Sequence, residues 1–328
     1  MAASPTLPDT FRVLASFDPP RGSLRGAPWE EYVDWAIAQG LAPLAAYNLE
    51  YRLGGADAPE WARDRLLSIY QGSLNDNVMK LVNLKRAIDE VEGERLVLVG
   101  GASFAEALYP HVAFRPVLDI QLWVPPPSLP ALFRALGQMD FRPDAGAAAE
   151  AGVAHVLTDG RTLVLVRTSW LGPGRAAAEE ALLGRLLPLR VYGPSAFRLD
   201  VEDAILALCL EHAREGYQLP LLSFVDLREL LSGAPSLGGP YSRALDLDVL
   251  RARAREWRLE RALWASVSVA ARLFPELEPV AAGARPELRK ATRTLLERLV
   301  VEPASAPGKM RAVRGADRLR RLLVGGTG

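Results

Sequence analysis

Cysteine is almost absent from the 328-residue sequence, which contains only Cys209. A single cysteine excludes a framework of internal disulfides and a cysteine-rich metal site. Because Cys209 lies in the apolar run AILALCLEH, we expect it to be a buried core residue.

Long apolar runs are also missing. No uninterrupted apolar segment approaches the roughly 20 residues that a helix needs to span a bilayer. The start, MAASPTLPDTF, has no basic stretch followed by an apolar one, which is the pattern of a secretory leader. We therefore expect a cytoplasmic protein without a membrane span.

An excess of one charge is the third absence, since 39 basic residues balance 39 acidic ones. No overall field steers the protein toward nucleic acid or an anionic membrane, so nucleic acid is not an expected partner. Any polyanionic partner must therefore bind to a local patch of positive charge. The 49% hydrophobic content is enough for one large core or two modest ones.

Helical periodicity dominates the N-terminal region, residues 1–93. The stretch from Pro28 to Leu53 has apolar residues near helical spacing, and a second stretch from Ala58 predicts a long helix ending near Gly93. The expected inward-facing stripe of that helix consists of Leu74, Val78, Leu81, Leu84 and Ile88.

The pattern changes in residues 94–195, which read as a small α/β unit. RLVLVGG predicts a strand stopped by two glycines, SFAEALYP a helix, and VLDIQLWV a second strand before the breaker PPPSLP. LPALFRALGQMDF then predicts a helix, and AHVLTDGRTLVLVRTSW predicts two strands joined by the turn TDG. The order favours a small mixed sheet.

Helices return in residues 196–302. Asp200 is a good N-cap for the helix LDVEDAILALCLEHAREG. LPLLSFVDLRELLSG, DLDVLRARAREWRLERALWASVSVAARLF and RPELRKATRTLLERLVV predict further amphipathic helices. Residues 303–328 form a basic tail that we expect to be loosely ordered. The predicted fold class is thus α+β and helix-rich.

Several of these segments together resemble a known family. A family of bacterial proteins called uncharacterised nucleotidyltransferases has a similar pattern. In this sequence the similar residues are LVGGASFAEALYP, then Arg115, then LDIQLWV. LCLEHA at 208–213 and FVDL at 224–227 fit later features of that family. The similarity runs from about Trp29 to Phe274. It implies a polymerase-beta-like nucleotidyltransferase fold, in which a small mixed sheet is flanked by N-terminal and C-terminal helical bundles.

The resemblance also implies a chemistry. Such enzymes transfer a nucleotidyl group from a nucleoside triphosphate to a hydroxyl, using Mg²⁺ held by an Asp-x-Asp pair and a third acid from a neighbouring strand. A glycine turn and the next helix N-terminus approach the phosphates. Carried over to this sequence, Asp119 is the expected metal ligand and catalytic acid, and the expected nucleotide-binding residues are Gly100, Gly101, Ser103 and Arg115.

Three departures from the pattern point to a degenerate site. Gln121 stands where the second acid belongs, and a neutral amide is a poorer ligand than a carboxylate for a hard cation. The third acid should fall in LVLVRTSW, where residues 163–166 are all apolar. The family's lysine before the glycine is also missing, since Val99 and Gly100 occupy that place. We therefore expect Mg²⁺ and nucleotide binding to be weakened or lost.

Three hypotheses remain open. The first is a degenerate pseudoenzyme that binds a nucleotide or a protein partner through the inherited cleft. The second is an active Mg²⁺-dependent nucleotidyltransferase acting on a small-molecule or protein hydroxyl, with Asp119 and Gln121 at its catalytic centre. The third is a helical interaction or scaffold protein with a vestigial cleft.

Single residues have simpler alternatives. Arg115 is either a phosphate ligand or a surface loop residue. His212 is either a core histidine or a partner of Asp226 on the next helix. Gly100 and Gly101 are either a phosphate cradle or a plain strand-to-helix turn.

Overall fold

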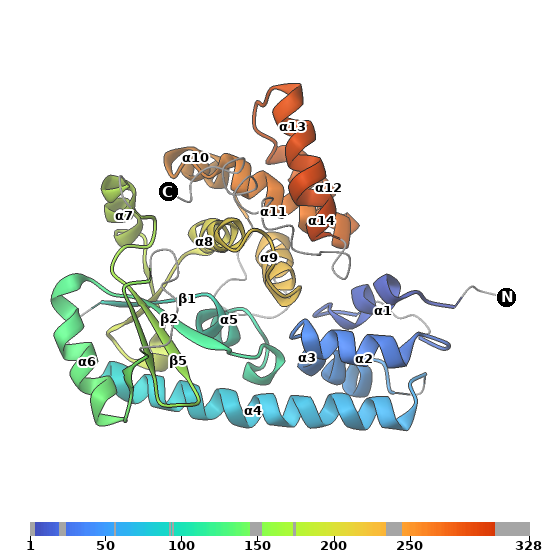
Figure 1. The fold of residues 1–328 in the computed structure, drawn as a ribbon, viewed down its shortest axis with the longest axis horizontal. Coiled ribbons are helices and arrows are strands. Elements are labelled where there is room, and N and C mark those ends of the chain that lie inside the picture. Colours follow the sequence, from blue (N-terminus) through green and yellow to red (C-terminus); the bar gives the residue numbers. More distant parts are fainter. Residues whose placement is uncertain are drawn as a thin grey trace.

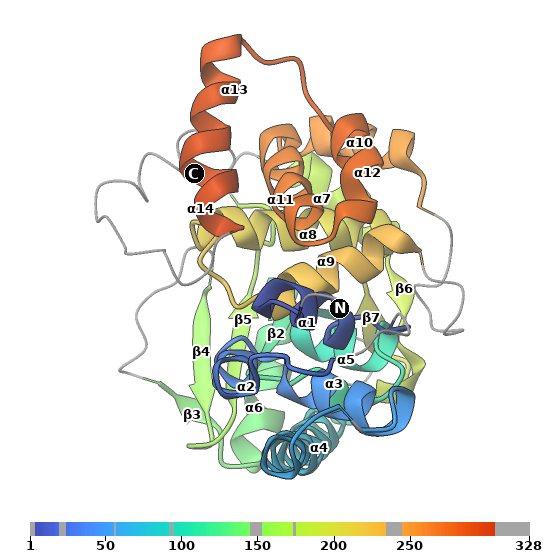
Figure 2. The same ribbon diagram turned by 90° about the vertical axis from the view of Figure 1, so that its right-hand side faces the viewer.

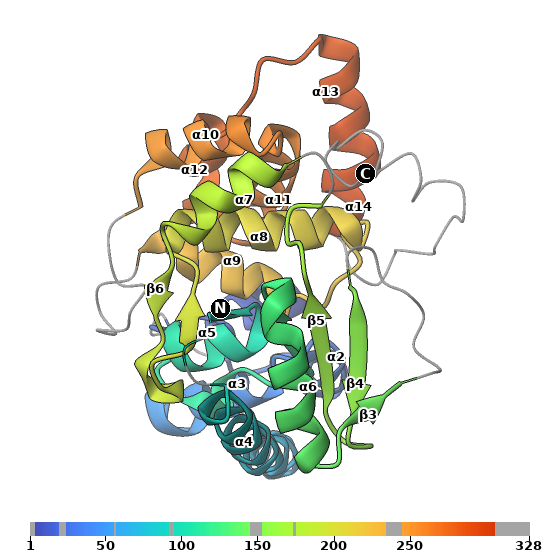
Figure 3. The ribbon, with the colours of Figure 1, turned by 90° about the vertical axis from the view of Figure 1, so that its left-hand side faces the viewer.

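The computed structural model describes residues 4–19, 24–55, 57–91, 93, 95–144, 153–172, 175–233 and 245–305. A mixed sheet lies in the middle of the molecule, with the long helix α4 on one side and the helix α8 on the other (Figures 1 and 3). The chain is therefore α+β and helix-rich, as the sequence predicts. The basic tail predicted at 303–328 lies almost entirely outside the described residues.

Within the described residues the sheet has seven strands in the order β3-β4-β5-β2-β1-β7-β6. The central pair β2 and β5 is parallel, β1 is antiparallel to β2, and β7 is parallel to β1. The strands are β1 (Leu96–Val99), β2 (Asp119–Trp123), β3 (Arg142–Pro143), β4 (His155–Thr158), β5 (Leu163–Arg167), β6 (Leu187–Pro188) and β7 (Ala196–Arg198).

Apolar runs account for the central strands. All residues of β1 are buried, and β2 is buried from Ile120 onward. The hairpin of β4 and β5 forms around the predicted turn, where the Asp159 carboxylate accepts hydrogen bonds from the backbone N–H groups of Arg161 and Thr162. The four strands and the turn predicted from the sequence are confirmed.

Helices of the N-terminal region pack beneath and beside the sheet (Figures 1 and 2). Helix α4 is 30 residues long and makes the base of the molecule. These helices are α1 (Leu7–Leu14), α2 (Trp29–Ala38), α3 (Ala42–Tyr47) and α4 (Glu60–Asp89), with a π-helical turn at Asn48–Arg52.

The inward face of α4 differs from the predicted stripe. Leu81, Leu84 and Ile88 are buried, but Val78 is 43% exposed, and the polar residues Asn77 and Lys80 are buried instead. The reason is that this part of α4 faces a loop with backbone groups that need partners, and buried polar groups persist where they are hydrogen-bonded.

Three shorter helices belong to the central unit. Helix α5 follows β1 directly and contacts both β1 and β2. The helices of this unit are α5 (Gly101–Ala107), α6 (Leu129–Gln138) and α7 (Ala176–Leu183), with single 3₁₀ turns at Val112–Phe114, Pro126–Ser128 and Arg190–Tyr192.

The C-terminal helices stack above the sheet (Figure 1). Asp200 caps the first of them, its side chain accepting a hydrogen bond from the backbone N–H of Asp203 at 2.9 Å. These helices are α8 (Val201–Arg214), α9 (Leu222–Ser232), α10 (Leu247–Glu256), α11 (Glu260–Leu273), α12 (Glu278–Gly283), α13 (Lys290–Leu296) and α14 (Glu302–Ala304), with a 3₁₀ turn at Pro275–Leu277 and a π-helical turn at Glu297–Val301.

One sequence prediction fails here. The long amphipathic stretch after residue 245 is two helices, because the chain turns at Trp257–Leu259, where Arg258 has φ +57°. Trp257 and Leu259 on either side of the turn are fully buried, so core packing outweighs the cost of a non-glycine residue in the left-handed region.

A single cluster of buried apolar residues extends from Phe11 to Ala304 and includes residues of all three predicted regions. Cys209 is buried within it as a free thiol. Among the described residues, no helix is both long and apolar enough to cross a membrane. A cytoplasmic location stays a prediction.

Candidate functional site

Asp119 and Gln121 lie on the same face of β2, because strand side chains alternate. Gln121 is paired with Val99 at the end of β1, so it lies beside the glycine turn. A side chain at Gly100 would meet the Gln121 amide at 3.8 Å and the Glu211 carboxylate of α8 at 4.0 Å. The inherited motif therefore faces α8.

The Gln121 amide lies between two carboxylates. Its Nε2 donates a hydrogen bond to Oε1 of Glu211 at 3.0 Å, and the amide also hydrogen-bonds the Asp119 side chain. Its Oε1 is buried and has no hydrogen-bond partner among the described residues. A neutral NH₂ group thus joins an acid of the sheet to an acid of the C-terminal helices.

Burial raises the pKa of both carboxyls. For Asp119 the rise is opposed by the charge of Arg115, by the hydrogen bond from Gln121 and by the charge of Arg167. For Glu211 the pKa is raised by burial and by the nearby Asp119, and lowered by Gln121 and the same two arginines. The charge of Asp119 raises the pKa of Glu211, and the nearby arginines supply positive charge to both carboxyls.

Arg115 is held by a buried acid of α9. Its Nε lies 3.2 Å from Oδ1 of Asp226 and its Nη2 lies 2.8 Å from Oδ2, a two-pronged contact. The Tyr109 hydroxyl donates to Oδ1 of Asp226 at 2.8 Å. Asp226 is fully buried and the Arg115 side chain is 12% exposed. Arg115 is therefore a largely buried ion-pair partner and not a surface loop residue.

The same guanidinium packs over the glycine turn. A Cβ atom at Gly101 would overlap Nη1 of Arg115. Glycine is needed there for the arginine to pass, in addition to any role toward a phosphate. Gly100 has φ +63°, a conformation that favours glycine at the start of α5.

The loop that carries Arg115 is anchored on α4 by buried polar side chains. Asn77 donates to the carbonyls of Val112 and Arg115 at 2.6 and 2.8 Å and accepts from the backbone N–H of Val117 at 2.9 Å. Lys80 donates to the Val117 carbonyl at 2.7 Å. These bonds fix the entry into β2, and so the direction of Asp119.

The third-acid position is apolar, as the sequence indicates. β5 runs parallel to β2 with Leu163 opposite Asp119 and Leu165 opposite Gln121. The next residue on that face is Arg167, which is 4% exposed and stacks over the Trp170 ring at 5.2 Å. A cationic side chain therefore follows the position where the resemblance predicts the third acid.

Helix α8 packs over the glycine turn. Gly100, Gly101 and Ser103 are buried, and Ala204, Ala207 and Leu208 of α8 cover the turn. A cavity that these α8 residues share with Gly100 and Ser103 is about 10 Å³, roughly the room that one water molecule needs. A triphosphate does not fit in this cavity with α8 in this position.

The residues at the site do not fit two Mg²⁺ ions. A two-metal centre needs clustered carboxylate oxygens. Here the acids from two elements are separated by an amide whose nitrogen, a donor, faces Glu211. Nowhere in the described part of the chain do three or more His, Cys, Asp or Glu side chains gather as a metal-binding group.

His212, the neighbour of Glu211, belongs to the core. Its ring lies 4.3 Å from the Phe224 ring, centroid to centroid, and neither ring nitrogen has a hydrogen-bond partner among the described residues. Burial lowers its pKa to about 3, so the ring is neutral near pH 7. The suggested pair with Asp226 is wrong, because Asp226 binds Arg115 and Tyr109.

Sequence reasoning missed Glu211, Arg167 and Tyr109 as parts of this arrangement. A pointer to two of them existed, since Tyr109 lies in ALYP and Glu211 in LCLEHA, while Asp226 lies in FVDL. The structure brings these separate segments to Arg115 and Gln121. Of the predicted site residues, Asp119, Gln121, Gly100, Gly101 and Arg115 lie together, and Ser103 is buried one turn into α5.

Comparison with known proteins gives one assignment. No curated protein and no solved structure matches the chain. One protein family, described as uncharacterised nucleotidyltransferase, matches residues 25–275, which is most of the sequence. The chain belongs to this uncharacterised nucleotidyltransferase family.

Proposed function

We propose that this chain is a catalytically inactive member of its family, in which the inherited site joins the sheet to the C-terminal helices. The observation that carries the proposal is the Gln121 amide between Asp119 and Glu211. Nucleotidyl transfer needs a divalent cation beside the first acid. A hydrogen-bond donor in this place satisfies the carboxylates without a metal ion.

Charge compensation supports the proposal. Arg115 and Arg167 both lower the pKa values of Asp119 and Glu211. Buried carboxylates are tolerated where nearby charges and hydrogen bonds compensate them. Two guanidinium groups do here what bound cations do in an active site, so the acids need no further partner.

The closed glycine turn points the same way. The cavity between Gly100 and α8 is about 10 Å³, so α8 has to move before a triphosphate can enter it. Such a movement breaks the Gln121–Glu211 hydrogen bond. We infer that a partner, nucleotide or protein, contacts this chain outside the closed site.

The test is calorimetric titration of the purified protein with ATP, GTP, CTP and UTP, each with Mg²⁺ and with chelator. The proposal expects no Mg²⁺-dependent binding in the wild type and no difference between the wild type and Asp119→Ala. Binding that requires Mg²⁺ and disappears in Asp119→Ala contradicts it.

A second candidate is an active Mg²⁺-dependent transferase, and one observation favours it. Asp119 and Glu211 converge from two elements, and Gln121 Oε1 has no partner among the described residues. Rotation of the amide by half a turn aims three oxygens at one point, where a single cation can bind.

This alternative is tested by pyrophosphate release from each nucleoside triphosphate in the presence of Mg²⁺ and candidate hydroxyl acceptors. It requires that Glu211→Gln abolish release as completely as Asp119→Asn does. No release from the wild type, or release that persists in Glu211→Gln, excludes it in this form.

A further inference from the structure

A second cavity lies in the C-terminal helices, away from the site on β2. It is about 500 Å³ in volume and is bounded by α10, the first turn of α11 and the segment 284–288. Cavities of roughly 300–1,000 Å³ are the size that binds small organic molecules. None of its lining residues belongs to the Asp119 cluster.

Arginine dominates the walls of this cavity. Four arginines and two glutamates line it, Arg251, Arg255, Arg261, Arg285, Glu260 and Glu287. These six side chains carry a net charge of +2, in a chain with a net charge of zero. This local patch is what a polyanionic ligand needs in a protein without an overall positive field.

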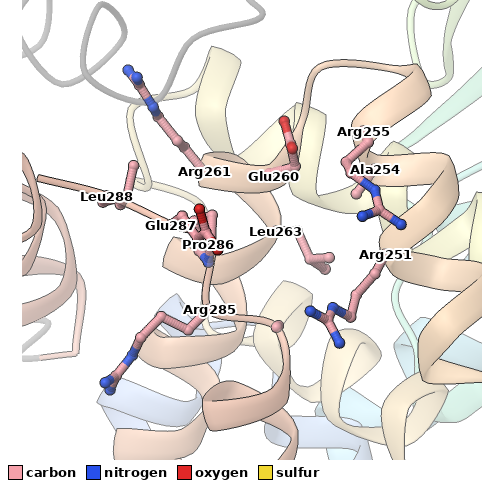
Figure 4. Close-up of a pocket in the computed structure, with 11 residues that line it drawn as sticks. Arg251, Ala254, Arg255, Glu260, Arg261, Leu263, Arg285, Pro286, Glu287 and Leu288 are labelled. Atoms are coloured by element: carbon pink, nitrogen blue, oxygen red, sulfur yellow. The ribbon is translucent and has the colours of Figure 1, made fainter.

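The floor is apolar. Ala254 and Leu263 are 1% exposed and Ala284 is 5% exposed. Figure 4 shows Leu263 between the wall that carries Arg251 and Arg255 and the opposite side, where Arg285 lies. A ligand here can place an apolar body on the floor and charged groups on the walls.

Two of the arginines have no partner among the residues that the structure describes. Arg255 and Arg285 make no hydrogen bond or ion pair with any described residue, and Arg251 has only a contact of 3.8 Å with the exposed Asp248. Arg251 and Arg255 are four residues apart on α10, so their side chains lie on one face of the helix. Guanidinium groups in this arrangement can bind phosphate oxygens in pairs.

The turn between the two helices creates the site. Because Arg258 takes a left-handed conformation, α11 starts beside the last turns of α10 instead of continuing it. Leu259, the N-cap of α11, offers no side-chain hydrogen bond to the first turn. The N–H groups of a helix's first turn have no acceptor within the helix, and they add to the attraction for an anion.

We propose that this cavity binds a small organic phosphate of nucleotide size. Arg251 and Arg255 hold the phosphate groups, and the organic body lies over Leu263 and Ala254. The proposal does not depend on whether the Asp119 site is active.

The test is calorimetric titration of the full-length chain with ATP and with inorganic pyrophosphate, in chelator and at low ionic strength. We expect ATP to bind more tightly than pyrophosphate, because only ATP covers the apolar floor. Arg251→Ala and Arg255→Ala each weaken ATP binding by about tenfold to a hundredfold, the loss of a charge-assisted hydrogen bond. Added salt weakens it further.

Two controls separate this cavity from the rest of the molecule. Arg272→Ala removes an exposed arginine from α11 that does not line the cavity, and it leaves ATP binding unchanged. Asp119→Ala also leaves it unchanged, since the β2 site takes no part.

Three results with these two probes overturn the proposal. They are no binding of either probe, binding that Arg251→Ala and Arg255→Ala do not weaken, and equal weakening by Arg272→Ala. A short single-stranded RNA or a phosphopeptide that binds more tightly than ATP through the same arginines also overturns it, in favour of a macromolecular partner.

Discussion

Arg115 and Gln121 each connect the central sheet region to a different C-terminal helix. Arg115 binds Asp226 of α9, and Gln121 binds Glu211 of α8. The resemblance to nucleotidyltransferases predicts a phosphate contact for Arg115 and a metal ligand at the position of Gln121. Here their polar atoms are used within the chain, so the consequences of mutating them should appear first in stability.

Replacing Arg115 with alanine leaves Asp226 buried without its cation. We expect a loss of about 3–5 kcal/mol in the free energy of unfolding, the usual effect of breaking a buried ion pair. Arg115→Lys keeps the charge but not the two-pronged contact and should lose less. Urea unfolding measures both, with the exposed Arg134→Ala as control. A loss below about 1 kcal/mol in Arg115→Ala contradicts this account.

His212 gives a pH-dependent prediction. Its pKa is about 3 in the folded protein and roughly 6.5 when unfolded, so the unfolded state binds more protons between these values. The wild type should therefore lose stability relative to His212→Phe as the pH falls below about 6.5. Phenylalanine keeps a ring against Phe224.

The measurement is urea unfolding of both proteins at about pH 7.5 and about pH 5. Burial raises the pKa of Asp203 to about 6 and of Glu229 to about 7, so these groups favour the folded state as the pH falls. They are present in both proteins and cancel in the difference. If the difference in unfolding free energy between the two proteins does not change with pH, His212 takes up its proton in the folded protein as readily as in the unfolded one. That result contradicts the prediction.

At the residue scale the sequence predicted which positions cluster, but not what they bind. The resemblance to the family predicts that the β2 motif, the glycine turn and Arg115 belong to one site. Glu211 was missed because it is 90 positions from Gln121 in the chain, and the segment LCLEHA does not indicate which residues it contacts. Only packing of α8 over the sheet brings the two side chains into contact.

Two helices position this cluster. α4 supplies Asn77 and Lys80 to the loop before β2, and α8 supplies Glu211 and the residues that cover the glycine turn. The buried polar side chains of α4 interrupt its apolar stripe, which explains why periodicity misplaced Val78.

Gly101, the first residue of α5, is predicted to tolerate no side chain. Gly101→Ala pushes a Cβ atom against Arg115, which Asp226 holds in place, and should cost about 1–3 kcal/mol of stability. Gly72→Ala is the matched control. Gly72 lies exposed in α4 with no atom within 4 Å of an added Cβ, so alanine should stabilise by about 0.5–1 kcal/mol.

Chemical denaturation of the two alanine variants checks this prediction. In an Arg115→Ala background the cost of Gly101→Ala should shrink, because the overlapping guanidinium is gone. If Gly101→Ala is as stable as the wild type, the close approach of Arg115 to the turn is wrong.

Elements with strong patterns were predicted well, and short ones were not. β1, β2, β4 and β5 follow from apolar runs and a turn. β3 and β6 are two-residue edge strands that each contain a proline, and they form only because a neighbouring strand is present. The break between α10 and α11 has no glycine or proline to mark it, only the burial of Trp257 and Leu259.

On the scale of the whole molecule, one hydrophobic cluster connects the N-terminal helices, the sheet and the C-terminal helices. The polar contacts of Arg115 and Gln121 cross the same boundaries. Further ion pairs connect α8 to its surroundings, with Arg253 2.7 Å from Asp200 and Arg185 2.9 Å from Asp203. The predicted regions should therefore not unfold independently.

We expect the loss of helix and the loss of tryptophan packing to coincide in urea. Far-ultraviolet circular dichroism follows the helices, and tryptophan fluorescence follows side chains such as Trp29, Trp170 and Trp257, which are buried in different parts of the fold. Superimposable curves indicate one cooperative unit. Two separated transitions show that the sheet and the helical regions are energetically independent.

The most direct test of the central claim is the unfolding free energy of Gln121→Asp in chelator. If the Gln121 amide joins Asp119 to Glu211, aspartate removes the donor and adds a third acid, and stability should fall by about 2–4 kcal/mol. The exposed Gln71→Asp in α4 should change it by less than about 1 kcal/mol. A Gln121→Asp protein as stable as the wild type without metal contradicts the claim that this amide has replaced the cation.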